Sequence, residues 1–396
     1  MKIGVIGCGY VGLSNASVWA NKYEVGLWDK DLEKLKKIQK GIVPFKDKFL
    51  EKNIDVLCNR FVTYDTFEEF VDSNYVFLVA VPTDINEEIR GFDTAGLEQV
   101  VKDIVTRKRK KGESDYSIII KSTIPIGFID KAKMMCDCDN VLYIPEFLRE
   151  GTAYYDCIYP QRIIVGGISD GIRQIINQYM EIIFKLGNKK NITVLFVSTK
   201  EAEAIKLFSN AYLAMRVAFF NEVDTLAESE GLNTKKVIDG ICGDSRIGYY
   251  YNNPSFGYVG YCLPKDTKNL AWFSDSLHLI RAVIDSNEAR KKRIATKIIH
   301  SQKSVGVYKL NMKYNSDNLR GSALLDIIKI LLEDNVFVAI CDPDNEEIIK
   351  DKLQVSWVST LEELDEKCDI ILSNRIYPEL CRYIDKVYTR DIFERD

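Results

Sequence analysis

The chain begins Met1-Lys2-Ile3-Gly4-Val5-Ile6-Gly7-Cys8-Gly9-Tyr10-Val11-Gly12, and this stretch determines how the first half folds. The apolar residues predict a strand, and the glycines after it have the spacing Gly-x-Gly-x-x-Gly at a strand-to-helix turn, which is the dinucleotide-binding fingerprint. The first glycine makes the tight turn, the second lets a pyrophosphate approach the backbone, and the third lets the helix pack on the strand. The helix N-terminus then faces the phosphates. We therefore expect a dinucleotide to contact Gly7, Gly9, Tyr10, Val11 and Gly12.

The next apolar run, residues 23–28, ends in an acidic residue. Asp29 follows the glycines at about the distance where a carboxylate accepts hydrogen bonds from the adenosine ribose hydroxyls. A phosphorylated ribose would meet like charge there, so Asp29 favours NAD over NADP. Lys30 beside it is expected at the same site. The alternative is an ordinary turn aspartate.

Strands and helices alternate through the first half of the chain. Apolar runs at residues 75–80, 117–121, 141–144, 162–165 and 194–197 are separated by helical stretches. This alternation predicts a doubly wound parallel sheet, in which ligands collect at the carboxyl ends of the strands. Three of these ends are polar and contain Thr83, Thr123, and the pair Glu146 and Glu150. Locally, the threonines could equally be strand-end caps and the glutamates helix-dipole partners.

A long helix is expected from Thr199 to Ser229. Its apolar residues recur mostly at steps of three and four, as on one helix face: Ile205, Phe208, Tyr212, Met215, Phe219 and Leu226. Lys206 and Asn210 are four residues apart and therefore project from one side of the helix. Most helical lysines are surface residues, so a solvent-facing Lys206 is the alternative. The polar run Arg290–Arg293 is expected on an exposed helix face.

A second α/β sheet is expected near the end of the chain. Apolar runs at residues 304–308, 336–341, 370–372 and 387–388 flank a helix that starts at Ala323. This unit lacks the glycine triplet, so we expect it to bind a nucleotide other than NAD. The fold class is thus α/β, with two Rossmann-like doubly wound domains joined by a long central helix and a helical domain. The predicted domains are 1–198, 199–300 and 301–396.

Composition limits the class of protein. The 396 residues are 46% hydrophobic and carry a net charge of −4 with acidic and basic residues interspersed, which indicates a folded multi-domain protein. Neither a nucleic-acid footprint nor a membrane-surface patch is indicated. Ten cysteines without a disulfide framework, and no expected signal peptide or membrane span, indicate the cytoplasm. Cys136 and Cys138 have no second pair at zinc-finger spacing, so we expect no metal site.

The densest cluster of reactive residues lies at residues 256–266. It contains Phe256-Gly257-Tyr258-Val259-Gly260-Tyr261-Cys262-Leu263-Pro264-Lys265-Asp266, which offers a nucleophile, a cation and a carboxylate. A buried structural cysteine is the alternative reading of Cys262. The pattern Phe-Gly-x-x-Gly-x-Cys-Leu-Pro-Lys-Asp resembles the active-site loop of the UDP-glucose/GDP-mannose dehydrogenase family. The resemblance extends over several separate motifs, from Met1 to the last residues.

This resemblance implies NAD-dependent oxidation of a nucleotide sugar. UDP-glucose, oxidised to UDP-glucuronate, is favoured, and UDP-N-acetyl sugars and GDP-mannose stay open. An alcohol that becomes a carboxylate surrenders four electrons, so two NAD are reduced in turn. The family mechanism implies that Cys262 holds the intermediate as a thiohemiacetal and then as a thioester. The first domain would bind NAD, the middle domain would carry the cysteine loop and the dimer contacts, and the last would bind the UDP-sugar.

The resemblance also assigns roles to single residues. Lys206, in Glu-Ala-Ile-Lys-Leu-Phe-x-Asn, would stabilise the oxyanion, with Asn210 orienting the same oxygen. Asp266 would position or activate water, and Glu146 would assist thioester hydrolysis. Thr83 and Thr123 would contact the cofactor or the catalytic water, and Glu150 would lie by the nicotinamide.

The residues implied to bind the sugar nucleotide come from four parts of the chain: Phe147, Leu148, Arg149, Glu150, Lys206, Asn210, Arg246, Tyr251, Asn253, Ser255, Phe256, Gly257, Gly260, Tyr261, Lys265, Lys313 and Arg320. Among these, Arg246 is expected to reach into the substrate site of a neighbouring subunit. The resemblance therefore implies a homodimer.

One departure from the family concerns Val259, which stands where the family usually has glycine. If the loop needs positive φ there, valine costs about 1 to 2 kcal/mol and should reduce activity without abolishing it. If φ is negative, valine is harmless. A nucleotide-sugar binding protein that has lost catalysis is therefore a second reading. A two-electron hydroxyacid dehydrogenase is a third, although it leaves Cys262 unexplained.

Overall fold

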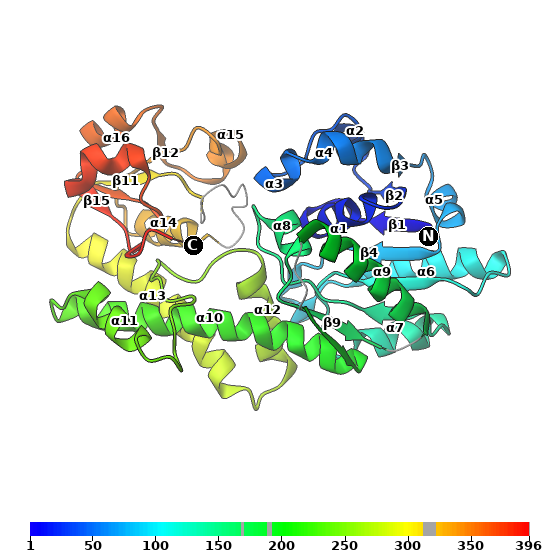
Figure 1. Cartoon of the computed structure of the whole chain (residues 1–396). Coiled ribbons are helices and arrows are strands. Elements are labelled where there is room, and N and C mark those ends of the chain that lie inside the picture. Colours follow the sequence, from blue (N-terminus) through cyan, green and yellow to red (C-terminus); the bar gives the residue numbers. More distant parts are fainter. Residues whose placement is uncertain (168–169, 188–191, 312–321, 396) are drawn as a thin grey trace. The chain divides into compact units, whose positions relative to one another are not determined.

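The computed structural model describes residues 1–167, 170–187, 192–311 and 322–395. The chain divides into two compact units, Met1–Phe208 and Ser209–Asp396. Each unit contains a mainly or wholly parallel sheet covered by helices on both faces, as Figure 1 shows. The predicted α/β class, with two Rossmann-like sheets and a long helix between them in sequence, is confirmed.

The sheet of the first unit is built from short, apolar strands. They are β1 (Ile3–Ile6), β2 (Val25–Trp28), β3 (Phe61–Thr63), β4 (Val76–Val79), β7 (Ser117–Ile120), β8 (Val141–Tyr143), β9 (Arg162–Gly166) and β10 (Thr193–Val197), while β5 (Ile85–Asn86) and β6 (Gly91–Phe92) form a separate antiparallel pair. Within the described residues, the strand order is β10-β9-β8-β7-β4-β1-β2-β3.

Neighbouring strands are parallel except for one pair. β8 and β9 run antiparallel and pair at Tyr143 and Gly166, so the expectation of a wholly parallel sheet is wrong there. The connecting segment leaves and re-enters the sheet at the same edge, whereas parallel neighbours need a crossover to the opposite edge. The sequence did not show this, because apolar strands buried on both faces read alike in either direction. The three-residue β3 was also not predicted.

Helices of the first unit bury both faces of this sheet. They are α1 (Tyr10–Ala20), α2 (Leu32–Gln39), α3 (Lys48–Glu51), α4 (Ile54–Leu57), η1 (Cys58–Arg60), α5 (Phe67–Ser73), α6 (Ala95–Lys110), α7 (Phe128–Cys136), α8 (Ala153–Ile158) and α9 (Asp170–Gly187). Ile3 and Val5 face a core that includes residues of α1, α8 and α9, whereas Phe77 and Val79 face a core that includes residues of α5, α6 and α7. Alternation of the strand residues between two cores explains why the strands are apolar throughout.

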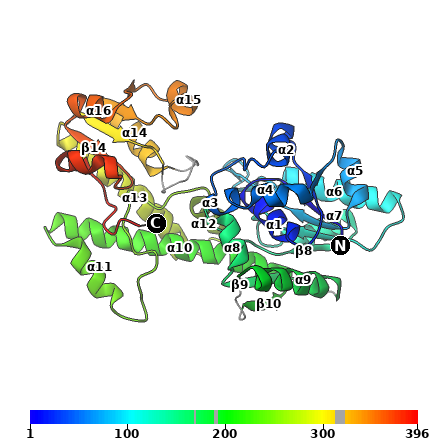
Figure 2. The same ribbon diagram turned by 45° about the horizontal axis from the view of Figure 1, so that its top comes forward.

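The second unit contains a smaller sheet, visible in Figure 2 beside its helices. Its strands are β11 (Val305–Tyr308), β12 (Val338–Cys341), β13 (Ser356–Trp357), β14 (Ile370–Leu372) and β15 (Val387–Tyr388), all parallel in the order β13-β12-β11-β14-β15. One face packs on residues of α13 (His278–His300) and α14 (Ala323–Glu333), and the other on residues of α16 (Leu361–Lys367) and η3 (Pro378–Lys386).

The remaining elements of the second half are helical. They are α10 (Thr199–Ser229), α11 (Thr234–Cys242), α12 (Cys262–Phe273), α15 (Glu346–Ile349) and η2 (Lys350–Lys352). The predicted bounds of α10 agree with the structure at both ends. Within the described residues, no helix is both long enough and apolar enough to cross a lipid bilayer.

The basic run Arg290–Arg293 on α13 is not a fully exposed face, and that expectation is wrong. Arg290 is 4% exposed and forms an ion pair with Asp224, a fully buried carboxylate on α10 that also pairs with Arg390. Lys291 is 7% exposed and lies 2.7 Å from Asp326. Charged residues become buried here because their partners neutralise them. Those partners are distant in sequence, so the local pattern could not reveal them.

Candidate active site

The glycine loop of the first unit has the geometry that a dinucleotide requires. Gly7 has φ of +88°, and a Cβ atom on Gly12 would lie 1.7 Å from the Gly7 carbonyl oxygen, so these two glycines shape the turn itself. Gly9 caps α1, and a Cβ atom there would meet nothing within 4 Å. The backbone at the helix N-terminus is therefore open to a ligand, and a pyrophosphate fits this site.

The carboxylate of Asp29 contacts the backbone of the glycine loop. It accepts hydrogen bonds from the backbone N–H groups of Cys8 at 2.7 Å and Asp31 at 2.9 Å. Lys34, on α2, lies 3.1 Å from the same carboxylate, whereas the neighbouring Lys30 is exposed. Asp29 thus holds the loop in place, and a charged acceptor at the end of β2 fits the ribose of NAD.

A polar cluster forms where β7 and β8 end. Lys121 makes an ion pair with Glu146 Oε1, and the side-chain amide of Asn15 on α1 donates to the same oxygen at 3.2 Å. Lys206 donates to the backbone carbonyl of Glu146 at 2.7 Å, and its Nζ lies 5.3 Å from the centre of the Phe147 ring. Because Lys206 is only 7% exposed, the solvent-facing alternative is wrong.

Sequence analysis predicted Glu146 and Lys206 but missed Lys121 and Asn15. Lys121 stands in one of the three polar strand ends, so its position was a usable signal. Nothing in the sequence linked Asn15 to Glu146, since 131 residues separate them.

Other predicted residues of the first unit also contact protein groups. The Thr83 hydroxyl is buried and donates to the Thr123 carbonyl at 2.7 Å, so it joins the ends of β4 and β7. This contact agrees with the strand-end alternative for Thr83, and contacts of Thr83 and Thr123 with the cofactor stay predictions. Arg149 forms a bidentate ion pair with Asp156, at 2.7 and 3.1 Å.

Two further members of the segment after β8 were predicted to bind substrate. Leu148 packs against the core that contains residues of α1, α8 and α9, and Glu150 is half-buried. Their contacts with substrate or nicotinamide stay predictions.

In the second unit, Cys262 is the first residue of α12 and is partly exposed. A helix N-terminus carries partial positive charge, so the Cys262 sulfur lies in an electropositive position. By contrast, burial raises the pKa of the Cys8 and Cys157 thiols, and it raises those of Cys341 and Cys368 to about 11. The partial exposure and helix position of Cys262 do not fit the buried-cysteine alternative.

Asp266 is fully buried one helical turn after Cys262. Its carboxylate accepts a hydrogen bond from the Asn210 side-chain amide and lies 3.0 Å from the Lys265 ammonium. Lys265 is 4.9 Å from the centre of the Tyr261 ring. The structure therefore brings together four predicted residues of the second unit and fixes the orientation of the Asn210 amide through Asp266.

The backbone of the cysteine loop is held from α13. Asn287 accepts from the Tyr258 N–H at 2.7 Å and donates to the Tyr258 carbonyl at 3.3 Å. A Cβ atom on Gly257 would lie 2.9 Å from the Asn287 side chain, so Gly257 is needed for this protein contact. Gly260 has φ of +97° and a Cβ atom there would meet nothing within 4 Å, which leaves the backbone next to Cys262 accessible.

Val259 adopts an ordinary backbone conformation. It is not among the described non-glycine residues with positive φ, and its side chain packs against the core of the C-terminal sheet. The condition under which valine would strain the loop is therefore not met. Backbone strain gives no reason to expect impaired catalysis.

Several loop residues predicted to bind substrate have structural contacts as well. Phe256 is 1% exposed and stacks on Tyr388, with ring centres 5.9 Å apart. The Asn253 amide bonds Asp391 at 2.6 Å, and the Ser255 hydroxyl donates to the Gly257 carbonyl at 2.8 Å. Their substrate contacts stay predictions.

Arg246 lies on the protein surface. Its side chain is 87% exposed and pairs with Asp244 at 2.6 Å. Tyr251, also predicted to bind substrate, is 42% exposed and has φ of +50°. Lys313 and Arg320 lie outside the described residues.

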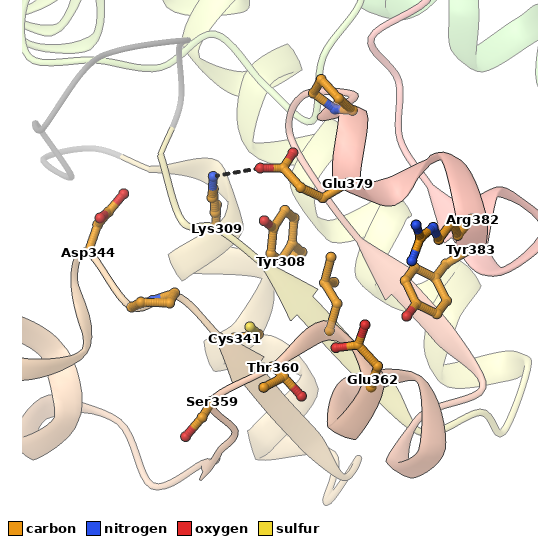
Figure 3. A pocket seen from close by; sticks show the side chains of 13 residues that line it. Tyr308, Lys309, Cys341, Asp344, Ser359, Thr360, Glu362, Glu379, Arg382 and Tyr383 are labelled. Atoms are coloured by element: carbon orange, nitrogen blue, oxygen red, sulfur yellow. Dashed lines mark ion pairs between the residues drawn. The ribbon is translucent and has the colours of Figure 1, made fainter.

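A pocket that the sequence analysis did not predict lies at the carboxyl ends of β11 and β12 (Figure 3). It has a volume of about 700 Å³ and is lined by Tyr308, Lys309, Cys341, Pro343, Asp344, Ser359, Thr360, Leu361, Glu362, Pro378, Glu379, Arg382 and Tyr383. Figure 3 shows Lys309 directed at Glu379, 3.9 Å away, while burial raises the pKa of Tyr308 to about 12. Carboxyl ends of such sheets commonly bind nucleotides. Two cations and three carboxylates line this pocket, so its charge does not select an anion.

Acidic, cysteine and histidine side chains do not gather as a metal centre in the described residues. Cys136 is buried at the end of α7, and Cys138 lies 3.4 Å from the Tyr116 hydroxyl.

Three family models match this chain in sequence order. They are the NAD binding domain of the UDP-glucose/GDP-mannose dehydrogenase family over residues 1–185, its central domain over 200–289, and its UDP binding domain over 306–391. UDP-glucose 6-dehydrogenase of Campylobacter jejuni is 41% identical over 406 residues, and that of Streptococcus pneumoniae is 39% identical over 402 residues. Both alignments cover 100% of each chain.

Solved structures give the same result. A UDP-glucose dehydrogenase from Pyrobaculum islandicum superposes with a TM-score of 0.86 and 26% identity, covering 100% of this chain and 96% of the other. The glycine loop, the partly exposed cysteine at a helix N-terminus and the full-length similarity agree with one another. The chain belongs to the UDP-glucose/GDP-mannose dehydrogenase family of NAD-dependent enzymes.

Proposed function

We propose that this enzyme oxidises UDP-glucose to UDP-glucuronate and reduces two NAD in each turnover. The observation that carries the proposal is Cys262 at the N-terminus of α12, followed one turn later by the buried Asp266. A two-electron alcohol dehydrogenase needs no such nucleophile, whereas an alcohol-to-acid oxidation needs a group that holds the aldehyde. Full-length similarity to two UDP-glucose 6-dehydrogenases supports this substrate.

The chemistry proceeds in four steps: oxidation of the alcohol, addition of the cysteine, oxidation of the thiohemiacetal and hydrolysis of the thioester. When bound, NAD would supply an acceptor for the hydride that leaves C6 of the sugar, once from the alcohol and once from the thiohemiacetal. In each oxidation the hydroxyl proton is released to solvent. Between these oxidations, the Cys262 thiolate adds to the aldehyde carbon and a proton is taken up by the resulting oxygen. After the second oxidation, water adds to the thioester, the carbon–sulfur bond breaks, and the product leaves as a carboxylate.

Lys206 and Asn210 are proposed to stabilise the oxygen that gains negative charge in these steps. Both are 7% exposed, and a charge-assisted hydrogen bond is strongest where water is excluded. Asp266 orients Asn210 and accepts from it. Glu146 takes the proton of the hydrolytic water, with Thr123 nearby at the end of β7.

The predicted binding residues keep their proposed roles. NAD contacts the glycine loop, Asp29, Lys30, Thr83, Thr123 and Glu150. The sugar nucleotide contacts the segment 147–150, Lys206, Asn210, residues of the loop 251–265, and Lys313 and Arg320. The proposed domains are 1–198, 199–300 and 301–396, and the proposed location is the cytoplasm.

A homodimer is proposed, and an exposed apolar stripe on α10 supports it. Tyr212, Phe219 and Leu226 are spaced seven residues apart and are 53%, 52% and 60% exposed. Large apolar side chains with this spacing form one helix face, which is typical of a helix that packs against another. We propose that a second copy covers this face and that Arg246 contributes to the substrate site of that copy.

Mixing two inactive variants tests the role of Arg246. Arg246→Ala and Cys262→Ser are each expected to be nearly inactive. After co-refolding or co-expression, half of the dimers should be mixed, and each mixed dimer has one intact site if Arg246 acts across the interface. About a quarter of wild-type activity should then return, by simple counting of sites. Absence of any recovery, with mixed dimers demonstrated by differential tags, would refute the shared site.

The count of NADH formed per UDP-glucose tests the reaction itself. Two NADH are expected for the four-electron enzyme, one for a two-electron dehydrogenase and none for a binding protein. A parallel panel of UDP-N-acetylglucosamine, UDP-N-acetylmannosamine and GDP-mannose tests the alternative substrates. UDP-glucose is expected to have the highest kcat/KM. A larger value for another sugar nucleotide would show that the enzyme carries out the same reaction on that substrate.

A further inference from the structure

Glu146 is held by its two donors in an asymmetric way. The Lys121 ammonium and the Asn15 amide both bond Oε1. No donor from the described residues bonds Oε2, and Oε2 is not among the buried side-chain atoms without a partner, so solvent can reach it. One carboxylate oxygen is therefore anchored while the other stays available to a water molecule.

The anchoring pair is costly to bury, which argues against an incidental contact. The side chains of Lys121 and Glu146 are 8% and 15% exposed. Removing an ammonium and a carboxylate from water is unfavourable, and a well-packed apolar pair of similar volume is often at least as stable. Stability alone therefore gives little reason for this ion pair.

Asn15 points to the same conclusion. Its amide nitrogen donates to Glu146 and to the Val11 carbonyl, at 3.2 and 2.9 Å. Its oxygen is buried and has no hydrogen-bond partner. An unsatisfied buried acceptor destabilises the fold, and leucine at this position would avoid that cost. The hydrogen bond to Glu146 thus explains why an asparagine stands at position 15.

Two buried groups also lie near the carboxylate. Burial, followed by the charge of Glu146, raises the pKa of Cys157, and burial likewise raises that of Tyr179. Both side chains are neutral at physiological pH. Lys206, the other cation near Glu146, bonds the backbone carbonyl and not the carboxylate. Lys121 therefore supplies the positive charge that contacts the side chain.

We propose that Lys121 is a positioning residue for thioester hydrolysis, assisted by Asn15, and that it fixes Glu146 so that Oε2 receives the proton of the attacking water. Water oxygen bonds the thioester carbon, the carbon–sulfur bond breaks, and the electron pair leaves on the Cys262 sulfur. This inference rests on the proposed function, in particular on the roles of Cys262 and Glu146. It concerns the last step only, because both oxidations precede hydrolysis.

Pre-steady-state kinetics of Lys121→Met test the proposal. With UDP-glucose and excess NAD, the variant should release a burst of two NADH per active site at nearly the wild-type rate. Its steady-state rate should then fall by about 10- to 100-fold, since misplacement of a reacting group by about 1 Å can cost that much. Intact-mass analysis of the quenched protein should show the sugar nucleotide bound to Cys262.

Two further variants make the result interpretable. Lys131→Met removes an exposed lysine that pairs with Glu98 at 2.7 Å, and it should behave like the wild type. Lys121→Arg retains the charge and should recover part of the steady-state rate. If Lys121→Met does not fold, Asn15→Leu removes the second donor and should give the same burst with a few-fold slower hydrolysis.

The outcomes separate this proposal from the proposed function. Equal loss of burst and steady-state rates in a folded Lys121→Met protein, or steady-state turnover within twofold of wild type, would overturn the positioning role. If the wild-type enzyme itself yields fewer than two NADH per sugar, or if Cys262→Ser completes both oxidations, the proposed function fails instead.

Discussion

Asp29 Oδ2 accepts a hydrogen bond from the backbone N–H of Cys8 at 2.7 Å. The carboxylate proposed to select the ribose of NAD therefore also fixes the glycine loop that approaches the pyrophosphate. Lys34 partly neutralises that carboxylate from α2, at 3.1 Å. Charge and hydrogen bonding at Asp29 can be separated by mutation.

Asp29→Asn keeps an oxygen that can accept from Cys8 but removes the negative charge. The preference for NAD over NADP, measured as the ratio of their kcat/KM values, should fall about tenfold, which corresponds to about 1.4 kcal/mol of discrimination. The melting temperature should change little because the loop contact is retained. Lys37→Ala, which changes an exposed lysine on α2, is the matched surface control. An unchanged cofactor ratio in Asp29→Asn would contradict the assignment.

Gly9→Ala and Gly12→Ala should fail in different ways. A Cβ atom at position 9 meets no protein atom within 4 Å, and Gly9 has φ of −82°, so the variant should fold with nearly wild-type stability. Its dissociation constant for NAD should rise at least tenfold, because the methyl group occupies space open to the pyrophosphate. Calorimetric titration measures this constant.

The same methyl group at position 12 would lie 1.7 Å from the Gly7 carbonyl oxygen. Gly12→Ala should therefore lose thermal stability even without cofactor. Gly96→Ala is the control, since its Cβ atom also meets nothing within 4 Å and it lies in α6. Equal thermal stability of the variants at positions 9 and 12 would be inconsistent with this difference in packing.

Cys262→Ser should stop the four-electron reaction. Serine is a much poorer nucleophile at neutral pH, so the thioester should not form and NADH production should fall at least 100-fold, with at most one NADH per sugar. Cys381→Ser, which changes an exposed cysteine on η3, should leave turnover unchanged. Undiminished formation of two NADH by Cys262→Ser would refute the covalent mechanism.

Val259→Gly should destabilise the enzyme without improving it. The valine side chain packs on the core of the C-terminal sheet, and its backbone is not in the left-handed region. Loss of apolar contact together with the added entropy of glycine should cost about 2 kcal/mol in denaturant titrations. Val259→Ala should cost about half of that, and kcat should stay within twofold in both variants. A large gain in kcat for the glycine variant would show that valine restricts the loop.

Asp224→Asn should change how stability depends on pH. Burial alone would raise the pKa of Asp224, but Arg390 and Arg290 together hold it below its ordinary value. A lowered folded-state pKa stabilises the protein above the unfolded pKa of about 3.9, and this contribution is lost as pH falls through the folded pKa. The wild type should exceed Asp224→Asn by about 3 kcal/mol near pH 7, and the difference should shrink below about pH 4.

Urea titrations at several pH values measure that difference. Asp139→Asn, at an exposed aspartate, should lower the free energy of unfolding by no more than about 0.5 kcal/mol at any pH. A difference between wild type and Asp224→Asn that does not vary with pH would contradict the charge interaction.

The sequence predicted elements best where local signals are strong. The bounds of α10 follow from apolar residues at helical spacing, and β1 with its glycine turn follows from a motif whose every position has a backbone requirement. The antiparallel pairing of β8 and β9 could not be predicted, because strand direction depends on the path of the connecting segment.

The main errors at single positions concerned charged residues that were expected at the surface and are buried. Arg290 was expected at the surface, yet it lies against Asp224, which is 66 residues away. Lys121 was placed only in a polar strand end and received no role, although it forms an ion pair with Glu146. Local spacing by itself does not distinguish a buried lysine or arginine from a surface one, because the group that neutralises it lies elsewhere in the chain.

By itself, the sequence determined the α/β class, the dinucleotide loop and the α10 helix, because each depends on residue types at short, fixed spacing. The role of Cys262 stays a prediction from the family resemblance. Tertiary structure decided which side chains hold the reactive groups: Lys121 and Asn15 on Glu146, Asp29 on the glycine loop, and Asn287 on the cysteine loop. These contacts join segments far apart in the chain. Their formation depends on how buried strands and helices pack, and no local pattern encodes that packing.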